Sequence, residues 1–145
     1  MIKINIKRIK ADSILPQKQT PGSAGFDLFA CLDNPVEIKP FEKALIPTGL
    51  VIEIPNGFEG QVRPRSGLAI KHGITVLNAP GTIDSDYRGE LCIILINLSN
   101  DIFIIENKMR IAQIVFNEIP TMIINEVDVI KMTGRGQNGF GSTGI

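Results

Sequence analysis

The sequence predicts an all-β protein. Its 145 residues include 9 prolines and 14 glycines, which divide the chain into short stretches. Most of these stretches are apolar or alternate apolar with polar residues, and only one has the features of a helix. Short strands separated by turn residues are typical of a β-sandwich or a β-barrel. The length favours one domain with a hydrophobic core of its own.

The strand pattern begins at the N-terminus, where isoleucines alternate with polar residues over residues 1–9 and predict a half-buried strand. Residues 16–25 are rich in proline, glycine and polar side chains, so we expect a loop there. Further strands are expected, in chain order, at residues 36–39, 44–54, 59–63, 91–98, 102–105, 110–116 and 122–130. Pro47 and Gly49 interrupt the second of these strands and indicate an edge or a bulge.

Two stretches differ from the half-buried strands. Residues 91–98 are nearly all apolar, which suits a strand that is buried on both faces. Residues 66–71 predict a helix of little more than one turn, ended by Gly73. Ser66 could cap this helix, and an anion could bind at its N-terminus beside Arg65. The alternative is a purely structural cap with Arg65 in solvent.

Residues 78–91 combine two turns with a group of polar side chains. A proline-glycine turn and two β-branched residues are followed by a second turn that carries Asp84, Asp86 and the single tyrosine, Tyr87. We interpret this segment as a β-hairpin. Charged groups on a loop held by a rigid scaffold are a common way to place catalytic side chains. A solvated hairpin tip without a catalytic role explains these residues equally well.

Composition limits the classes of function. The 15 acidic and 15 basic side chains balance, so no bulk attraction to nucleic acid or to an anionic membrane is expected. Cys31 and Cys92 are too few and too far apart for a disulfide framework. With His72 as the single histidine, they do not support a zinc site either. No charged and then apolar leader opens the chain, so we expect a soluble cytoplasmic protein.

The C-terminal residues 134–144 are rich in glycine and contain one aromatic side chain. Three of the glycines match the pattern of a dinucleotide fingerprint, but that motif needs a strand before it and a helix after it. We therefore reject a dinucleotide site. The exposed N–H groups, the hydroxyls and the Arg135 guanidinium of this tail are suited to phosphate. The alternative is a disordered tail, because a glycine-rich segment with one aromatic residue cannot pack a core of its own.

Gln113 interrupts an apolar run. By alternation it shares a face with Ile111 and Val115. A polar amide in such a place needs a hydrogen-bonding partner. Either Gln113 bonds backbone groups inside the protein, or it points into a ligand site.

Five segments carry a family resemblance. They are residues 24–28, 64–69, 78–91, 110–113 and 135–144, and in this order they resemble the five motifs of trimeric deoxyuridine triphosphatases (dUTPases). Each segment alone is a weak signal, whereas the ordered set is specific and spans nearly the whole chain. The resemblance implies a distorted jelly-roll β-barrel over residues 1–133. It also implies a flexible glycine-rich arm, residues 134–145, that closes over an active site.

The same resemblance implies the activity and the assembly. The family hydrolyses dUTP to dUMP and pyrophosphate, which supplies dUMP for thymidylate synthesis and keeps uracil out of DNA. It uses Mg²⁺ held mainly by the substrate phosphates, so no direct protein ligand is expected. The expected assembly is a homotrimer with sites at subunit interfaces, and neither nucleic acid nor a membrane is an expected partner.

The roles of individual residues follow from the matched motifs. Asp84 matches the aspartate that activates the attacking water, Asn78 the side chain that reads the uracil edge, and Tyr87 the ring against the deoxyribose. Asp27 resembles an indirect partner, either of the metal-bound waters or of an arginine, and Arg110 matches its motif without an assigned role. Further contacts to the base are expected from Gly81, Thr82, Ile83 and Cys92. Contacts to phosphate are expected from Arg65, Ser66, Gly67 and Gln113. The arm is expected to contact the substrate through Arg135, Phe140, Gly141, Ser142 and Thr143.

Two positions depart from the family pattern. Asn138 replaces the first glycine of a pair in the arm, which we expect to weaken or slow closure. Arg63 stands where alanine is common and adds a positive charge near the phosphate loop. Two alternative functions remain: a dCTP deaminase, which shares the fold and the trimer, and a regulatory nucleotide-binding protein. The residues 82–87 favour the hydrolase over the deaminase.

Overall fold

The computed structural model describes residues 2–139. Its strands form two four-stranded sheets and a two-stranded ribbon, all with antiparallel neighbours. The first sheet has the order β1 (Asn5–Arg8), β4 (Lys43–Glu53), β8 (Glu90–Asn97) and β6 (Ile74–Val76). The second has the order β2 (Phe26–Phe29), β10 (Arg110–Glu118), β5 (Phe58–Arg63) and β7 (Gly81–Ile83). The ribbon pairs β3 (Val36–Ile38) with β9 (Phe103–Ile105).

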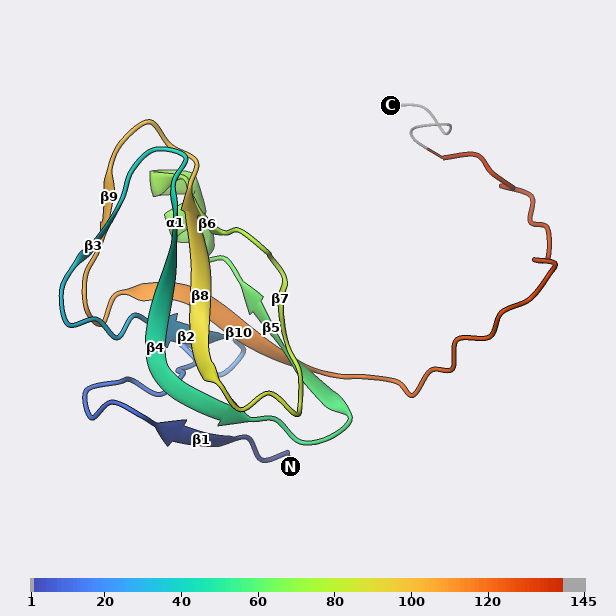
Figure 1. Cartoon of the computed structure of the whole chain (residues 1–145), viewed down its shortest axis with the longest axis horizontal. Coiled ribbons are helices and arrows are strands. Elements are labelled where there is room, and N and C mark those ends of the chain that lie inside the picture. The colour runs from blue at the N-terminus through green and yellow to red at the C-terminus, as the bar shows by residue number, and fades with distance from the viewer. Residues whose placement is uncertain (1, 140–145) are drawn as a thin grey trace.

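The strands from β4 to β8 alternate between the two sheets along the chain, and both sheets contribute side chains to one core (Figure 1). This is a jelly-roll-like arrangement, and the all-β prediction is confirmed. One short helix, α1 (Ser66–His72), is present in the described residues, and it ends at Gly73 as predicted. Its N-cap position is Arg65 and no side chain caps it, so the expected capping by Ser66 is wrong. No helix within residues 2–139 has both the length and the apolar composition to cross a membrane.

Strand β8 is buried on one face only. Leu91, Ile93 and Leu95 are almost completely buried, and each such side chain contributes about 1.5–3 kcal/mol by leaving water. The residues between them, such as Cys92 and Ile94, are only partly covered. The prediction of burial on both faces is therefore wrong within a single chain. The outer face of β4 and β8 remains an apolar surface, on which Leu45 is 63% exposed.

A bulge in β4 is fastened to the start of β8. The register between these strands shifts between Pro47 and Val51, where the sequence predicted an edge or a bulge. Gly49 has a φ of +67°, a conformation that favours glycine. Its N–H donates to Glu90 Oε1 at 2.8 Å, and the hydroxyl of Thr48 donates to the Leu91 carbonyl at 2.6 Å. Two side-chain bonds therefore fix the point at which β8 begins.

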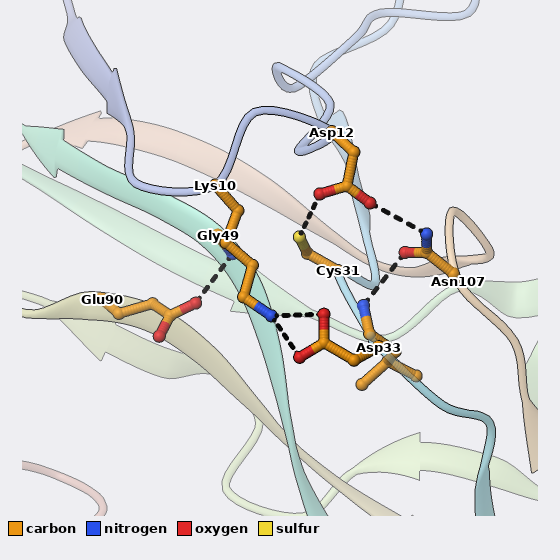
Figure 2. A network of polar contacts seen from close by, with 8 residues as sticks. Lys10, Asp12, Cys31, Asp33, Gly49, Glu90 and Asn107 are labelled. Carbon is orange, nitrogen blue, oxygen red and sulfur yellow. Dashed lines mark hydrogen bonds and ion pairs between the residues drawn. The ribbon is translucent and has the colours of Figure 1, made fainter.

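Figure 2 shows this Glu90–Gly49 bond together with a neighbouring network. The Asp12 carboxylate accepts from the Cys31 thiol at 3.6 Å and from the Asn107 amide at 3.1 Å. The bond from Asn107 lowers the pKa of Asp12, and burial raises the pKa of Cys31. At neutral pH the acceptor is therefore a carboxylate and the donor a thiol. The network joins loops that follow β1 and β2 to the loop before β10.

The segment of residues 78–91 is not a hairpin. Strand β7 pairs with β5, with Gln61 opposite Thr82 and Val62 opposite Gly81, whereas β8 belongs to the other sheet. A hairpin requires both arms in one sheet, so residues 84–89 instead form a turn that crosses between the sheets. The prediction failed because the partner of β7 is distant in sequence.

The chain makes no strand between Glu118 and the end of the described residues. Residues 122–130, predicted as a strand, leave the body and are exposed, with Ile123 91% and Ile124 100% accessible (Figure 1). An isolated strand has no partner for its backbone groups, so an apolar alternation alone does not form one. The first predicted strand is also shorter than expected, because only Asn5–Arg8 pairs with β4.

Candidate active site

A polar cleft of about 370 Å³ lies on the outer face of the second sheet. It brings together five residues that the sequence predicted for phosphate recognition or for its support. These five residues come from β2, β10 and the start of α1 with its N-cap, Arg65. The lining residues are Gln19, Ser23, Ala24, Gly25, Asp27, Arg63, Arg65, Ser66, Gly67, Gln113 and Val115.

Asp27 holds two arginines in this cleft. Its Oδ1 accepts from Arg65 Nε at 3.2 Å, and its Oδ2 accepts from Arg110 Nη1 at 3.3 Å. Arg65 Nη1 also donates to the Arg110 carbonyl at 3.1 Å. The Asp27 side chain is only 10% exposed, so its charge has to be paired. Of the two roles that the sequence left open, these contacts fit that of an arginine partner.

Gln113 fulfils both alternatives that the sequence left open. Its Nε2 donates to the Pro64 carbonyl at 3.0 Å, and the residue also lines the cleft. A Cβ at Gly25 would overlap Gln113 Oε1, so the glycine makes room for the amide. The expected shared face with Ile111 is wrong, because the register shifts between Arg110 and Ala112 and leaves Ile111 in the core.

A second, more apolar cleft of about 310 Å³ lies between β7 and the outer face of β8. It contains five of the residues predicted for the base, the sugar and the attacking water. The lining residues are Leu45, Thr82, Ile83, Asp84, Tyr87, Glu90, Leu91, Cys92 and Ile94. Burial raises the pKa of the Cys92 thiol, and Glu90 acts in the same direction. Cys92 is therefore a neutral thiol at neutral pH, which fits a packing role and not that of a nucleophile.

The two carboxylates of the turn face different clefts. Asp84 lines the apolar cleft, whereas Asp86 lines a separate cleft with Lys3, Glu53 and Arg88. Of these two residues, Asp84 alone lines the cleft that also contains Tyr87 and apolar side chains.

Arg88 holds the turn that carries Asp84 and Tyr87, and the sequence-based candidates missed it. Its Nη1 donates to the carbonyls of Ser85 and Tyr87, at 2.6 and 2.8 Å. Its Nη2 lies 3.8 Å from Glu53 Oε1. The Tyr87 hydroxyl donates to the Glu90 carbonyl at 3.0 Å, which fixes the ring. The sequence carries no signal for this role, since bonds to backbone carbonyls leave no pattern of residue types.

The structure does not bring all the predicted residues together. Among residues 2–139, the polar cleft and the apolar cleft share no lining residue. Asn78 is exposed and lines neither of them, although its amide lies against Gly81. Arg135 is exposed in the tail, where its Nε donates to the Asn138 carbonyl at 2.8 Å. The predictions for Phe140, Gly141, Ser142 and Thr143 lie outside the described residues.

The acidic side chains of the described residues do not form a metal cage. Within residues 2–139, no three side chains of His, Cys, Asp or Glu gather closely enough to hold an ion. Both oxygens of Asp27 face arginines. Mg²⁺ in proteins commonly takes few protein ligands and several from substrate phosphates and water.

Comparisons with known proteins identify one family. A protein-family model described as dUTPase matches residues 11–144. The chain is 56% identical to the deoxyuridine 5'-triphosphate nucleotidohydrolase of Wolbachia pipientis subsp. Culex pipiens, over 99% of this chain and 96% of the relative. Identity to the protein of the same name from Treponema denticola is 55%, over 95% of this chain and 96% of that relative. The solved Staphylococcus bacteriophage 80alpha dUTPase with dUPNHPP is similar, with a TM-score of 0.89 and 27% identity over 99% of each chain.

We predict that Arg88→Met loosens the turn. Loss of two bonds from a charged donor, each worth about 1.5–3 kcal/mol, should speed hydrogen exchange of the Tyr87 amide by about tenfold or more. The matched control is Glu53→Gln, which weakens the ion pair and leaves the carbonyl bonds in place. Equal protection of this amide in the wild type and in Arg88→Met would show that the turn holds without Arg88.

Proposed function

The chain belongs to the dUTPase family, and on this premise we propose that it hydrolyses dUTP to dUMP and pyrophosphate, with a water activated by Asp84 attacking the α-phosphate. The observation that carries this proposal is the pair of clefts. One is apolar and holds a carboxylate and the tyrosine, and the other is polar and holds arginines. These are the chemistries that a nucleoside and a triphosphate require.

Asp84 is the proposed general base. A carboxylate can take a proton from water as the water attacks. Its place in the apolar cleft, on a turn fixed by Arg88, supports a defined direction of attack. General-base catalysis contributes about 10²–10⁴-fold, and the remainder of the rate comes from positioning and from charge stabilisation.

Recognition divides between the base, the sugar and the phosphates. Backbone groups of Gly81, Thr82, Ile83 and Cys92 and the amide of Asn78 would read the base, and the Tyr87 ring would exclude a 2′-hydroxyl. Arg65, Ser66, Gly67 and Gln113 would bind phosphate. When bound with the triphosphate, Mg²⁺ would neutralise charge on the phosphate oxygens. Asp27 would keep Arg65 in the orientation that receives the substrate.

The assembly we propose is a homotrimer with shared active sites. A single nucleotide has to reach both the apolar cleft and the polar cleft, and within residues 2–139 these have no lining residue in common. A second copy can place its phosphate cleft against the base cleft of the first. The exposed apolar face around Leu45 and the apolar residues 122–130 supply surface for such contacts. The arm, residues 134–145, would close over a neighbouring site through Arg135 and the residues that follow it.

The proposed product gives the reaction its place in metabolism. dUMP is the precursor for thymidylate synthesis, and removal of dUTP keeps uracil out of DNA.

We predict that Asp84→Asn lowers kcat for dUTP by about 10²–10⁴-fold, because the amide keeps the shape and loses the basicity. Binding of a non-hydrolysable dUTP analogue should stay within a few-fold of the wild type. Asp86→Asn is the matched control, since it removes a carboxylate of the same turn that faces another cleft.

The assay for this prediction measures pyrophosphate and ammonia with dUTP, dCTP or UTP and Mg²⁺. The wild type should release pyrophosphate from dUTP and no ammonia from dCTP. Near-normal turnover by Asp84→Asn would refute its role as the base, and ammonia from dCTP would favour the deaminase.

Our prediction for Tyr87→Ala concerns the sugar. Loss of the ring should raise the ratio of kcat/KM for UTP to kcat/KM for dUTP, because the steric exclusion of the ribose hydroxyl is lost. Tyr87→Phe is the control, since it keeps the ring and removes only the bond to the Glu90 carbonyl. If the alanine variant kept the wild-type ratio, Tyr87 would have a structural role alone.

A further inference from the structure

Arg63 lines the polar cleft, and it belongs to a row of paired residues that crosses the three strands β2, β10 and β5. Gln113 of β10 pairs with Asp27 of β2 on one side and with Arg63 of β5 on the other. Side chains at paired positions of antiparallel strands project from the same face of a sheet. All three residues line the cleft, so the guanidinium of Arg63 stands on the same surface as the groups assigned to phosphate.

A polar ladder along β5 orients this guanidinium. Arg63 Nη2 donates to Gln61 Oε1 at 2.6 Å, and Gln61 Nε2 donates to Glu59 Oε1 at 2.7 Å. The side chains of Glu59, Gln61 and Arg63 lie on one face of β5, because residues two apart along a strand point the same way. Because the Glu59 carboxylate accepts from the amide nitrogen of Gln61, the amide oxygen of Gln61 points toward Arg63. The ladder uses one nitrogen of a group that has five N–H donors.

The charge of Arg63 is the one in this cleft that no carboxylate pairs. Arg65 and Arg110 both face Asp27, whereas none of the four ion pairs within residues 2–139 includes Arg63. Arg65 has also committed its Nε and Nη1 to protein acceptors. A polyanion entering the cleft would therefore meet Arg63 as an ordered and unneutralised cation.

We propose that Arg63 is a further substrate-binding residue, which attracts and holds the polyphosphate part of the nucleotide. The proposal rests on the proposed function and adds a residue to its phosphate site. Arginine suits this task because its planar fork matches phosphate oxygens. Since Arg63 stands outside the Asp84 turn, its contribution is to binding and leaves the proton transfer unchanged.

The test compares Arg63→Met with the wild type in full-length protein. Arg63→Met should weaken binding of a non-hydrolysable imido analogue of dUTP by about tenfold and leave binding of dUMP unchanged, because dUMP lacks the polyphosphate. The salt dependence of analogue binding should also become shallower, since one phosphate-neutralising cation is gone. KM for dUTP should rise with little change in kcat.

Two further variants sharpen the result. Arg63→Lys keeps the charge and should retain the salt dependence with part of the affinity. Arg8→Met removes an exposed arginine of the other sheet, which lines none of the clefts described above, and should match the wild type. Unchanged dUMP binding in Arg63→Met also shows that the base cleft is intact.

Equal analogue affinity and equal salt dependence in Arg63→Met and the wild type would overturn the proposal. Inorganic pyrophosphate supplies a separate arm, in which the wild type should bind and Arg63→Met should bind about tenfold more weakly. If the wild type neither binds the analogue nor hydrolyses dUTP, the proposed function fails. The pyrophosphate arm then still decides whether Arg63 holds a polyphosphate, and absence of pyrophosphate binding by the wild type counts against it.

Discussion

The position of β10 between β2 and β5 is the constraint on which the polar cleft depends. The three strands lie far apart in sequence, and their pairing places Asp27, Gln113 and Arg63 in one row. Asp27 then pairs with Arg65 and Arg110 at the nearly buried end of this row. Removal of one partner from a buried ion pair typically costs more than the pair contributes, because a charge is left without compensation. The row therefore joins three strands and also lines the polar cleft.

The second cleft depends on a different joint, the bulge of β4. Bonds from Thr48 and Gly49 fix the start of β8, and Arg88 fixes the turn that precedes it. Neither the bulge of β4 nor the turn held by Arg88 shares a residue with the row of Asp27, Gln113 and Arg63 on the second sheet. The polar cleft and the apolar cleft are therefore held in place by separate sets of contacts. Each chain carries both clefts, and in the reaction that we propose one active site combines the apolar cleft of one copy with the polar cleft of another.

Much of the fold and of the candidate site could be predicted from local sequence, and the failures have a common cause. Residues 66–71 form the predicted helix, and most predicted strands are present because side-chain period and turn residues are local signals. The partner of β7 and the exposed state of residues 122–130 depend on distant strands, which a local pattern does not specify. Ile111 left the expected face because a bulge changes the period. Arg88 acts on backbone carbonyls, so its role depends on how the turn folds.

The most direct test of the account asks whether a site draws its two halves from different copies. Asp84→Asn lacks the base, Arg65→Ala lacks a phosphate ligand, and each alone should be nearly inactive. Mixed trimers formed from equal amounts of the two chains should recover about a quarter of the wild-type activity, since one interface combination in four joins an intact Asp84 to an intact Arg65. Activity that stays at the level of the separate variants, although mixed trimers have formed, would contradict the shared site.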